Sequence, residues 1–151
     1  MNRDIELAPA DPRDAPAIVR VFSEARSGMT YLPVVHTAEE IMEHFTNLVH
    51  LGHCWVAKDQ ESIVGFMEVR TGWLNHLYVA PESQKMGIGK ALLDQAKVIA
   101  QTALQLWMFE DNKGAIRFYE REGFVLEEQR DMHTAVNEEN LPDRRYGWHP
   151  R

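Results

Sequence analysis

The sequence predicts a mixed α/β (α+β) fold, in which helices cover both faces of a mostly antiparallel central sheet of about seven strands. Strand-like stretches of alternating or continuous apolar residues are interspersed with stretches whose apolar residues recur every three to four positions. Three strand-like stretches follow one another across gaps of two residues, and such short gaps require antiparallel neighbours. With 151 residues the chain has the length of one domain, so we expect a single domain over residues 1–151.

The chain begins with a predicted strand and a predicted helix. Residues 4–10 alternate in polarity as a half-buried strand does. Residues 11–28 carry helix signals at both ends. Asp11 is expected to cap this helix, Pro12 to occupy its first position and Gly28 to end it.

A second helix and three strands follow. Thr37 stands three residues before Glu40, which is the spacing of a capping box at a helix start. The strands are predicted at residues 53–59, 62–70 and 73–80, and the short turns between them indicate an antiparallel meander.

The second half of the chain predicts a helix, a strand, a helix and two strands. The apolar face of the first helix is expected to consist of Ile88, Leu92, Ala96 and Ile99. A strand at 104–109 precedes a helix that Asn112 opens and Gly123 closes, and two strands follow at 124–130 and 144–148. The predicted order is therefore β-α-α-β-β-β-α-β-α-β-β.

Composition and charge exclude several classes of function. The chain has a net charge of −7, whereas nucleic-acid-binding domains neutralise phosphates with clustered lysine and arginine. An acidic surface suits an amine-bearing partner better. No run of about 18 apolar residues occurs, and no apolar segment follows the charged start of the chain. We expect a cytoplasmic protein with no nucleic-acid or membrane partner, in which the single cysteine, Cys54, packs in the core.

The stretch QKMGIGKALL, residues 84–93, places two glycines one residue apart at the start of a helix. It is not a Walker loop, because Lys90 is followed by Ala91 and no glycine stands five residues before Gly89. It is not a dinucleotide-binding fingerprint either, because the third glycine position holds Leu92.

Two interpretations of Gly87 and Gly89 stay open on spacing alone. In the first, the unpaired N–H groups and the positive dipole end of the helix bind an anion. The glycines then let a pyrophosphate approach the backbone, and Lys85 and Lys90 add positive charge. In the second, the glycines form a turn that lets the helix dock closely on the sheet.

Two stretches resemble motifs of one enzyme superfamily. LYVAPESQKMGIGKALLDQA (77–96) closely resembles the acetyl-CoA-binding motif of the GNAT superfamily of N-acetyltransferases. LWMFEDNKGAIRFYEREGF (106–124) resembles the strand and helix that follow in the same superfamily. The order of the predicted elements also matches the GNAT fold, so the resemblance covers essentially the whole chain. It implies an acetyl-CoA-dependent N-acetyltransferase.

The resemblance also implies how acetyl-CoA is bound. The backbone of residues 77–79 pairs with the pantetheine arm and polarises the thioester carbonyl. The backbone N–H groups of residues 85–90 cradle the pyrophosphate, and Asn112 contacts the arm near the sulfur. The implied cofactor-binding residues are Leu77, Tyr78, Val79, Gln84, Lys85, Met86, Gly87, Ile88, Gly89, Lys90, Asn112, Ala115 and Phe118.

Tyr119 is the implied general acid. It stands seven residues, or two helical turns, after Asn112, so both side chains project on the same side of the helix. A phenol with a reference pKa near 10 can protonate the departing thiolate. The alternative is a core aromatic residue whose hydroxyl is tied to a neighbour.

The acceptor needs a base, because only about 0.04% of an amine with a pKa near 10.4 is neutral at pH 7. Glu68 is the favoured candidate, since it lies among apolar residues in a region where the family commonly places its base. His76 is the second candidate, because a histidine titrates near about 6.5, although it can instead be a packed, hydrogen-bonded residue.

The sequence thus predicts acetyl transfer to the primary amine of a small molecule, by direct attack in a ternary complex. Two alternatives stay open: acetylation of protein N-termini or lysines, and a non-catalytic module that holds an acyl-CoA. The first two helices and residues 131–143 are expected to form the acceptor pocket, and dimers are frequent in the family. No metal site is expected, because His44, His50 and His53 lack the spacing of metal ligands.

Overall fold

The structure is a computed structural model and describes residues 4–131 and 137–150. Its strands are β1 (Ile5–Pro9), β2 (Cys54–Asp59), β3 (Ser62–Arg70), β4 (Trp73–Val79), β5 (Leu104–Phe109), β6 (Val125–Arg130) and β7 (Asp143–Trp148). Its α-helices are α1 (Ala15–Ser27), α2 (Ala38–His50), α3 (Ile88–Ala100) and α4 (Lys113–Arg121). Short 3-10 turns occupy Pro12–Asp14 and Pro81–Ser83. The order of strands and helices is the one predicted from the sequence.

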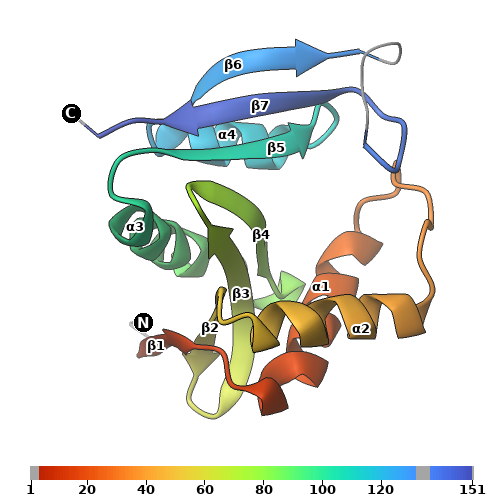
Figure 1. Ribbon diagram of the computed structural model, residues 1–151, viewed down its shortest axis with the longest axis vertical. Coiled ribbons are helices and arrows are strands. Elements are labelled where there is room, and N and C mark those ends of the chain that lie inside the picture. Colours follow the sequence, from red (N-terminus) through yellow and green to blue (C-terminus); the bar gives the residue numbers. More distant parts are fainter. Residues whose placement is uncertain (1–3, 132–136, 151) are drawn as a thin grey trace.

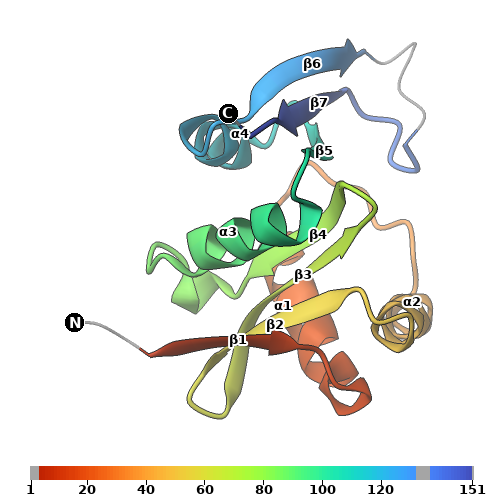
Figure 2. The same ribbon diagram turned by 60° about the vertical axis from the view of Figure 1, so that its left-hand side comes forward.

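The strands form one sheet in the order β1-β2-β3-β4-β5-β7-β6. All neighbouring strands are antiparallel except β4 and β5, which are parallel. Helices α1 and α2 cover one face of the sheet, and α3 and α4 cover the other (Figure 1 and Figure 2). The mixed, mostly antiparallel sheet with helices on both faces is therefore confirmed.

Each face of the sheet has its own hydrophobic core. Under α1 and α2 the fully buried residues include Ile18, Phe45 and Phe66. Under α3 and α4 they include Leu92 and Leu104. Burying large side chains on both faces fixes the orientation of every strand, because a shift by one residue would move each side chain to the opposite face.

The first helix differs from its prediction. Asp11 caps the 3-10 turn and forms a capping box with Asp14, whereas the α-helix itself begins at Ala15. Pro16 explains the break, since it has no N–H to donate to the carbonyl of Pro12 four residues earlier. The predicted end of this helix at Gly28 is correct.

Other helix boundaries follow the predicted caps. Thr37 Oγ1 accepts a hydrogen bond from the Glu40 N–H at 3.1 Å, and Glu40 Oε1 accepts one from the Thr37 N–H at 2.9 Å. The side chain of Asn112 caps α4 by accepting from the Ala115 N–H at 3.2 Å. Gly123 follows α4 with a φ of 94°, in the left-handed region that glycine favours.

The buried face of α3 was predicted correctly except at its end. Ile88, Leu92 and Ala96 are buried, but the side chain of Ile99 is 38% exposed and Leu93 is buried in addition. Ile99 lines a cavity at the C-terminal end of α3 instead of packing in the core. The helical periodicity identifies a face, but it does not show where the sheet beneath that face ends.

Strands β4 and β5 diverge, and this separation positions the candidate site. Their only paired residues in the described chain are Trp73 and Gln105. Beyond them, β4 pairs on one side only, with β3, where Leu77 lies opposite Met67. The other edge of β4 therefore has no strand partner along its C-terminal half, and Figure 1 shows β5 turning away from it. A bulge at Asn75 interrupts the pairing with β3 next to this edge.

Candidate active site

The loop of residues 80–87 connects the end of β4 to the N-terminus of α3. Gly87 caps the helix with a φ of 81°. No described residue accepts a hydrogen bond from the N–H groups of residues 88–90, as expected for the first turn of a helix. The side-chain amide of Gln84 donates to the Val79 carbonyl at 3.1 Å and ties the loop back to the strand. These free N–H groups and the helix dipole make an anion site possible here.

The two glycines of this loop are present for different physical reasons. Gly87 needs its left-handed backbone conformation, which a residue with a Cβ rarely adopts. Gly89 has an ordinary φ, and a Cβ built there would lie 3.6 Å from the Phe118 ring, an ordinary contact. Protein packing therefore does not require a glycine at 89, whereas close approach of a ligand to the backbone would.

The two lysines of the loop also differ. The Lys90 ammonium lies 3.1 Å from Asp94 and 3.3 Å from Glu122, so acidic neighbours already compensate its charge. Lys85 is exposed and forms no ion pair within the described part of the chain. Met86 is also exposed, while the side chain of Ile88 belongs to the core and leaves only its N–H for a ligand.

Helix α4 places the other implied residues beside this loop. Ala115 and Phe118 are half-buried and pack against the core, with Phe118 against Gly89. The Oδ1 of Asn112 is engaged as the helix cap, so its Nδ2 is the atom left to contact a ligand.

Tyr119 is a buried residue with an unengaged hydroxyl. It is 7% exposed, and its ring packs 5.3 Å from that of Phe124. No described residue forms a hydrogen bond with its hydroxyl, and this oxygen is not one of the fully buried unpaired polar atoms. Burial raises the pKa of Tyr119 above its ordinary value, and Tyr78 raises it further, so the phenol keeps its proton at neutral pH.

Glu68 and His76 lie directly opposite each other on β3 and β4, on the face that α1 and α2 cover. Glu68 is only 1% exposed. Its Oε1 lies 3.8 Å from the Arg70 Nε and accepts no hydrogen bond from the described residues. A buried carboxylate with an unpaired oxygen is a strong acceptor for any donor that reaches it.

His76 is surrounded by aromatic rings and by one other imidazole. The Phe45 ring lies 5.0 Å from it, and the Nε2 of His44 lies 3.3 Å from its Nε2. Its Nδ1 is buried and has no partner in the described chain. Burial lowers the pKa of His76 to about 3, and His44 and Arg26 lower it further. The sequence-based argument for His76 as a base assumed a value near 6.5, so a buried His76 cannot store a proton at neutral pH.

Several residues on the acceptor side were missed from the sequence. An ion pair of 3.7 Å between Arg26 of α1 and Glu139 joins residues 137–140 to this helix. His36 reaches Glu138 at 2.6 Å across 102 positions of sequence, and Figure 1 shows these two loops side by side. No periodicity or short motif could have predicted such contacts. Residues 132–136 of the expected acceptor loop lie outside the described residues.

The α1–α2 connection also approaches the diverging strands. The Tyr31 ring lies 6.2 Å from that of Phe109 at the end of β5. Its hydroxyl is buried without a hydrogen-bond partner in the described chain, and burial raises the pKa of Tyr31. Tyr31 lies between the first two helices, which are expected to help form the acceptor pocket.

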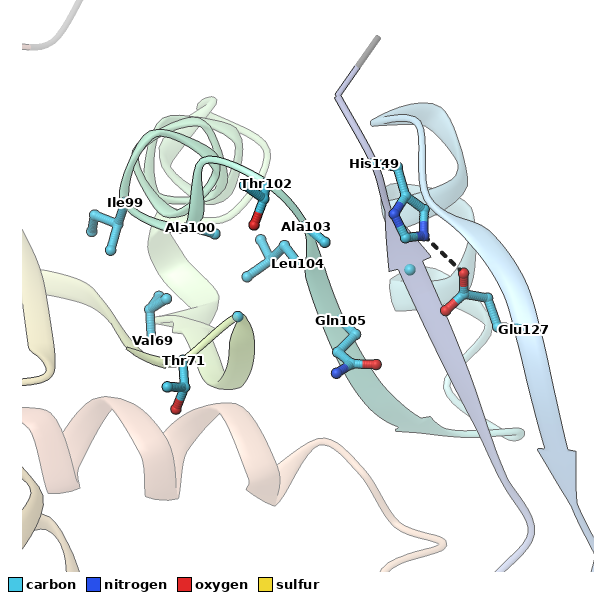
Figure 3. Close-up of a pocket in the computed structure, with 12 residues that line it drawn as sticks. Val69, Thr71, Ile99, Ala100, Thr102, Ala103, Leu104, Gln105, Glu127 and His149 are labelled. Carbon is cyan, nitrogen blue, oxygen red and sulfur yellow. Dashed lines mark hydrogen bonds and ion pairs between the residues drawn. The ribbon is translucent and has the colours of Figure 1, made fainter.

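A cavity of about 530 Å³ lies at the opposite end of the diverging strands, near the C-terminus of α3 (Figure 3). Its polar wall includes Glu127, which is 3.0 Å from the Nε2 of His149. None of the predicted site residues lines it. The cavity is thus separate from the candidate site.

The described residues give no support for a metal-binding site or for a cysteine nucleophile. No group of three or more His, Cys, Asp or Glu side chains in residues 4–131 and 137–150 could hold a metal ion. Cys54 is buried, and burial raises the pKa of its thiol to about 12, with Glu68 raising it further. A thiolate nucleophile at Cys54 is therefore disfavoured. None of the described helices is long and apolar enough to cross a membrane.

Comparisons with known proteins agree with this geometry. Residues 50–126 match the family model described as an acetyltransferase (GNAT) domain. Among curated proteins, the chain is 34% identical over 73 residues to peptidyl-lysine N-acetyltransferase YiaC of Escherichia coli, covering 48% of this chain and 49% of that protein. It is 33% identical over 88 residues to peptidyl-lysine N-acetyltransferase YjaB of Salmonella typhimurium, covering 58% and 60%. The chain thus spans only about half the length of these relatives.

Solved structures share the fold over nearly the whole chain. Apo YjaB from Escherichia coli superimposes with a TM-score of 0.79 at 18% identity, covering 96% of this chain and 97% of that one. PaiA N-acetyltransferase from Thermoplasma acidophilum, solved in complex with coenzyme A, superimposes with a TM-score of 0.73 at 20% identity, covering 97% and 99%. At these identities the likeness establishes the fold.

Proposed function

The chain belongs to the GNAT acetyltransferase family, and we propose that it transfers the acetyl group of acetyl-CoA to a primary amine. The observation that carries this proposal is the unpaired edge of β4, which the loop of residues 80–87 connects to the unpaired N–H groups at the start of α3. An extended acyl chain can add to the strand edge while its phosphates bind at the helix terminus. Acetyl-CoA has both parts that such a site would bind, because it carries an amide-bearing arm and a pyrophosphate.

Donor binding would use the backbone more than side chains. The edge from Leu77 to Val79 would pair with the pantetheine amides, and the N–H groups of residues 85–90 would hold the pyrophosphate. Gly89 supports this role, because nothing in the packing around it demands a glycine. The PaiA structure, which contains coenzyme A, lends family-level support. When bound, acetyl-CoA supplies an activated acyl group, and the chain orients it.

Tyr119 would hold the proton that the departing thiolate needs. Its hydroxyl forms no hydrogen bond with a described residue, and its raised pKa keeps it protonated at neutral pH. Asn112 would contact the arm through its Nδ2, since Oδ1 caps α4. Direct attack by the amine is favoured over an acyl-cysteine, because the raised pKa of Cys54 keeps its thiol protonated.

Glu68 and His76 are the two candidates for the base, and their burial has different consequences for each. Glu68 is a buried carboxylate whose Oε1 accepts no hydrogen bond in the described chain and has only a 3.8 Å ion pair with Arg70, so it can attract an ammonium group. His76 cannot store a proton at neutral pH, because its pKa is lowered to about 3. We therefore favour Glu68 as the residue that stabilises the positive charge of the acceptor while the proton leaves.

Two acceptor classes follow from different observations. The primary amine of a small molecule is the first candidate, because aromatic rings surround His76 and the Glu68 carboxylate lies opposite it. The side chain of a peptidyl lysine is the second candidate, because two relatives carry that activity in their names. Both acceptors present an ammonium group at the end of an alkyl chain, which the buried carboxylate would recognise in the same way.

The deciding experiment measures thiol release from acetyl-CoA with polyamines, amino acids, aminoglycosides and lysine-containing peptides. We expect turnover with at least one alkylamine, and the preferred class identifies the acceptor. A protein that binds acetyl-CoA in calorimetry yet acetylates no amine would be a binding module, and the transferase proposal would be wrong. A protein that binds no acetyl-CoA would contradict the donor site itself.

A further inference from the structure

Two histidines from distant parts of the chain meet beside the candidate base. His44 lies on α2 and His76 on β4, and their Nε2 atoms are 3.3 Å apart. At this distance one imidazole donates its N–H and the other accepts. His44 is exposed, whereas the Nδ1 of His76 is buried, so the pair connects the interior with solvent.

The inner end of this pair faces a second unsatisfied group. Glu68 is the direct cross-strand partner of His76, and the Oε1 of Glu68 and the Nδ1 of His76 are both buried without a hydrogen-bond partner in the described chain. Directly opposed residues of antiparallel strands have Cβ atoms about 4.5–5.5 Å apart. Buried polar atoms are nearly always paired in folded proteins, so two adjacent exceptions call for a functional explanation.

We propose that His44 is the exit of a proton route that carries the acceptor's proton from the active site to solvent through His76. This inference rests on the proposed acetyl transfer. His76 immediately precedes Leu77, the start of the β4 edge that would hold the thioester, so the route begins where the amine must react.

The proton balance of the route is simple. The ammonium N–H bond breaks, and a bond forms from that proton to the Nδ1 of His76. In the same step the Nε2–H bond of His76 breaks, and its proton bonds to the Nε2 of His44. The Nδ1–H bond of His44 then breaks, and that proton goes to water. No oxidation state changes, and the acceptor is left as the neutral amine. Proton exchange after product release returns both histidines to their starting tautomers.

The groups around His76 favour relay over storage. Arg26 on α1 and His44 on α2 both disfavour a lasting positive charge on its ring. Glu68 on β3 faces it with a carboxylate that stabilises a transient one. Cys54 on β2 and Tyr78 on β4 stay neutral, because burial raises the pKa of both. A neutral imidazole that accepts at one nitrogen while it donates at the other satisfies all of these constraints.

The test compares His44→Gln with His50→Gln, a matched control at another exposed histidine of α2, for which the described chain shows no contact with His76. Glutamine keeps a hydrogen-bonding amide but cannot carry a proton onward. With an alkylamine acceptor we expect kcat/KM of His44→Gln to fall about tenfold at pH 7, with unchanged affinity for acetyl-CoA. The deficit should shrink as the pH rises toward 10, and it should be smaller for an α-amine of pKa near 8, since in both cases a larger share of the acceptor is already neutral.

Three results would overturn the inference. Matching pH profiles for His44→Gln and the wild type would exclude His44 from the route. A loss that is the same at every pH and for every acceptor would indicate a structural role only. A wild-type protein that acetylates no amine would remove the proposed function and the route with it, and this is seen before any variant is compared.

Discussion

Tyr119 and Tyr146 are buried in the same core cluster, yet their hydroxyls are in opposite hydrogen-bonding states. The Tyr146 hydroxyl donates to the Glu120 Oε2 at 3.1 Å. The Tyr119 hydroxyl has no partner among the described residues. A buried tyrosine that contributes only to packing normally has its hydroxyl satisfied, as Tyr146 does. The Tyr119 hydroxyl is not one of the fully buried unpaired polar atoms of the described chain, so we propose that a ligand can reach it.

Tyr119→Phe should lower kcat about 100-fold while acetyl-CoA affinity and the free energy of unfolding stay nearly unchanged, because no protein hydrogen bond is lost. Tyr146→Phe is the matched control. It should leave kcat unchanged and cost about 1 kcal/mol of stability through its lost bond to Glu120. Steady-state kinetics and urea unfolding measure both effects, and a Tyr119→Phe variant with wild-type kcat would exclude the acid role.

The two glycines before α3 should respond in opposite ways to alanine. Gly87→Ala should destabilise the fold by about 1 kcal/mol or more, because its φ of 81° is strained for any residue with a Cβ. Gly89→Ala should be nearly neutral for stability. Gly89→Glu should also fold, but it should bind acetyl-CoA at least about 100-fold more weakly, because its carboxylate would repel the pyrophosphate. Calorimetric affinity equal to that of the wild type would contradict the phosphate site.

The lysines of the same loop provide a test of charge. Lys85→Gln should weaken acetyl-CoA binding several-fold at low salt, because its ammonium has no acidic partner in the described chain. Lys90→Gln should have a smaller effect, since Asp94 and Glu122 already compensate Lys90. Titrations at two ionic strengths separate the electrostatic part. A larger loss for Lys90→Gln would mean that these ion pairs break when the donor binds.

The predictions from sequence were accurate where the cause is local. The Thr37–Glu40 capping box and the Asn112 cap involve residues three positions apart, and both are present. The helix at residue 11 was predicted less well because a single proline, Pro16, competes with a good cap at Asp11.

Only the proposed donor half of the candidate site could be described from the sequence, and it stays a prediction. The phosphate loop and the β4 edge are contiguous in sequence, so a motif can describe them. The contact of His44 with His76 joins positions 32 residues apart, and the lowered pKa of His76 arises from packing between α1, α2 and the sheet. The ion pairs of Lys90 depend on where α4 ends relative to α3. Such properties arise only when the tertiary structure brings distant elements together.

The pH dependence of stability should reveal the burial of His76. Its pKa is lowered from 6.5 to about 3 on folding, so the unfolded chain binds more protons than the folded one between these values. Stability is therefore retained above about pH 6.5 and lost as the pH falls toward 3. This residue alone should remove about 2 kcal/mol between pH 7 and pH 5. In His76→Gln that part of the loss should disappear, whereas His50→Gln should keep it. Urea unfolding at both pH values measures the difference, and equal pH dependence in wild type and His76→Gln would mean that folding does not lower the pKa of His76.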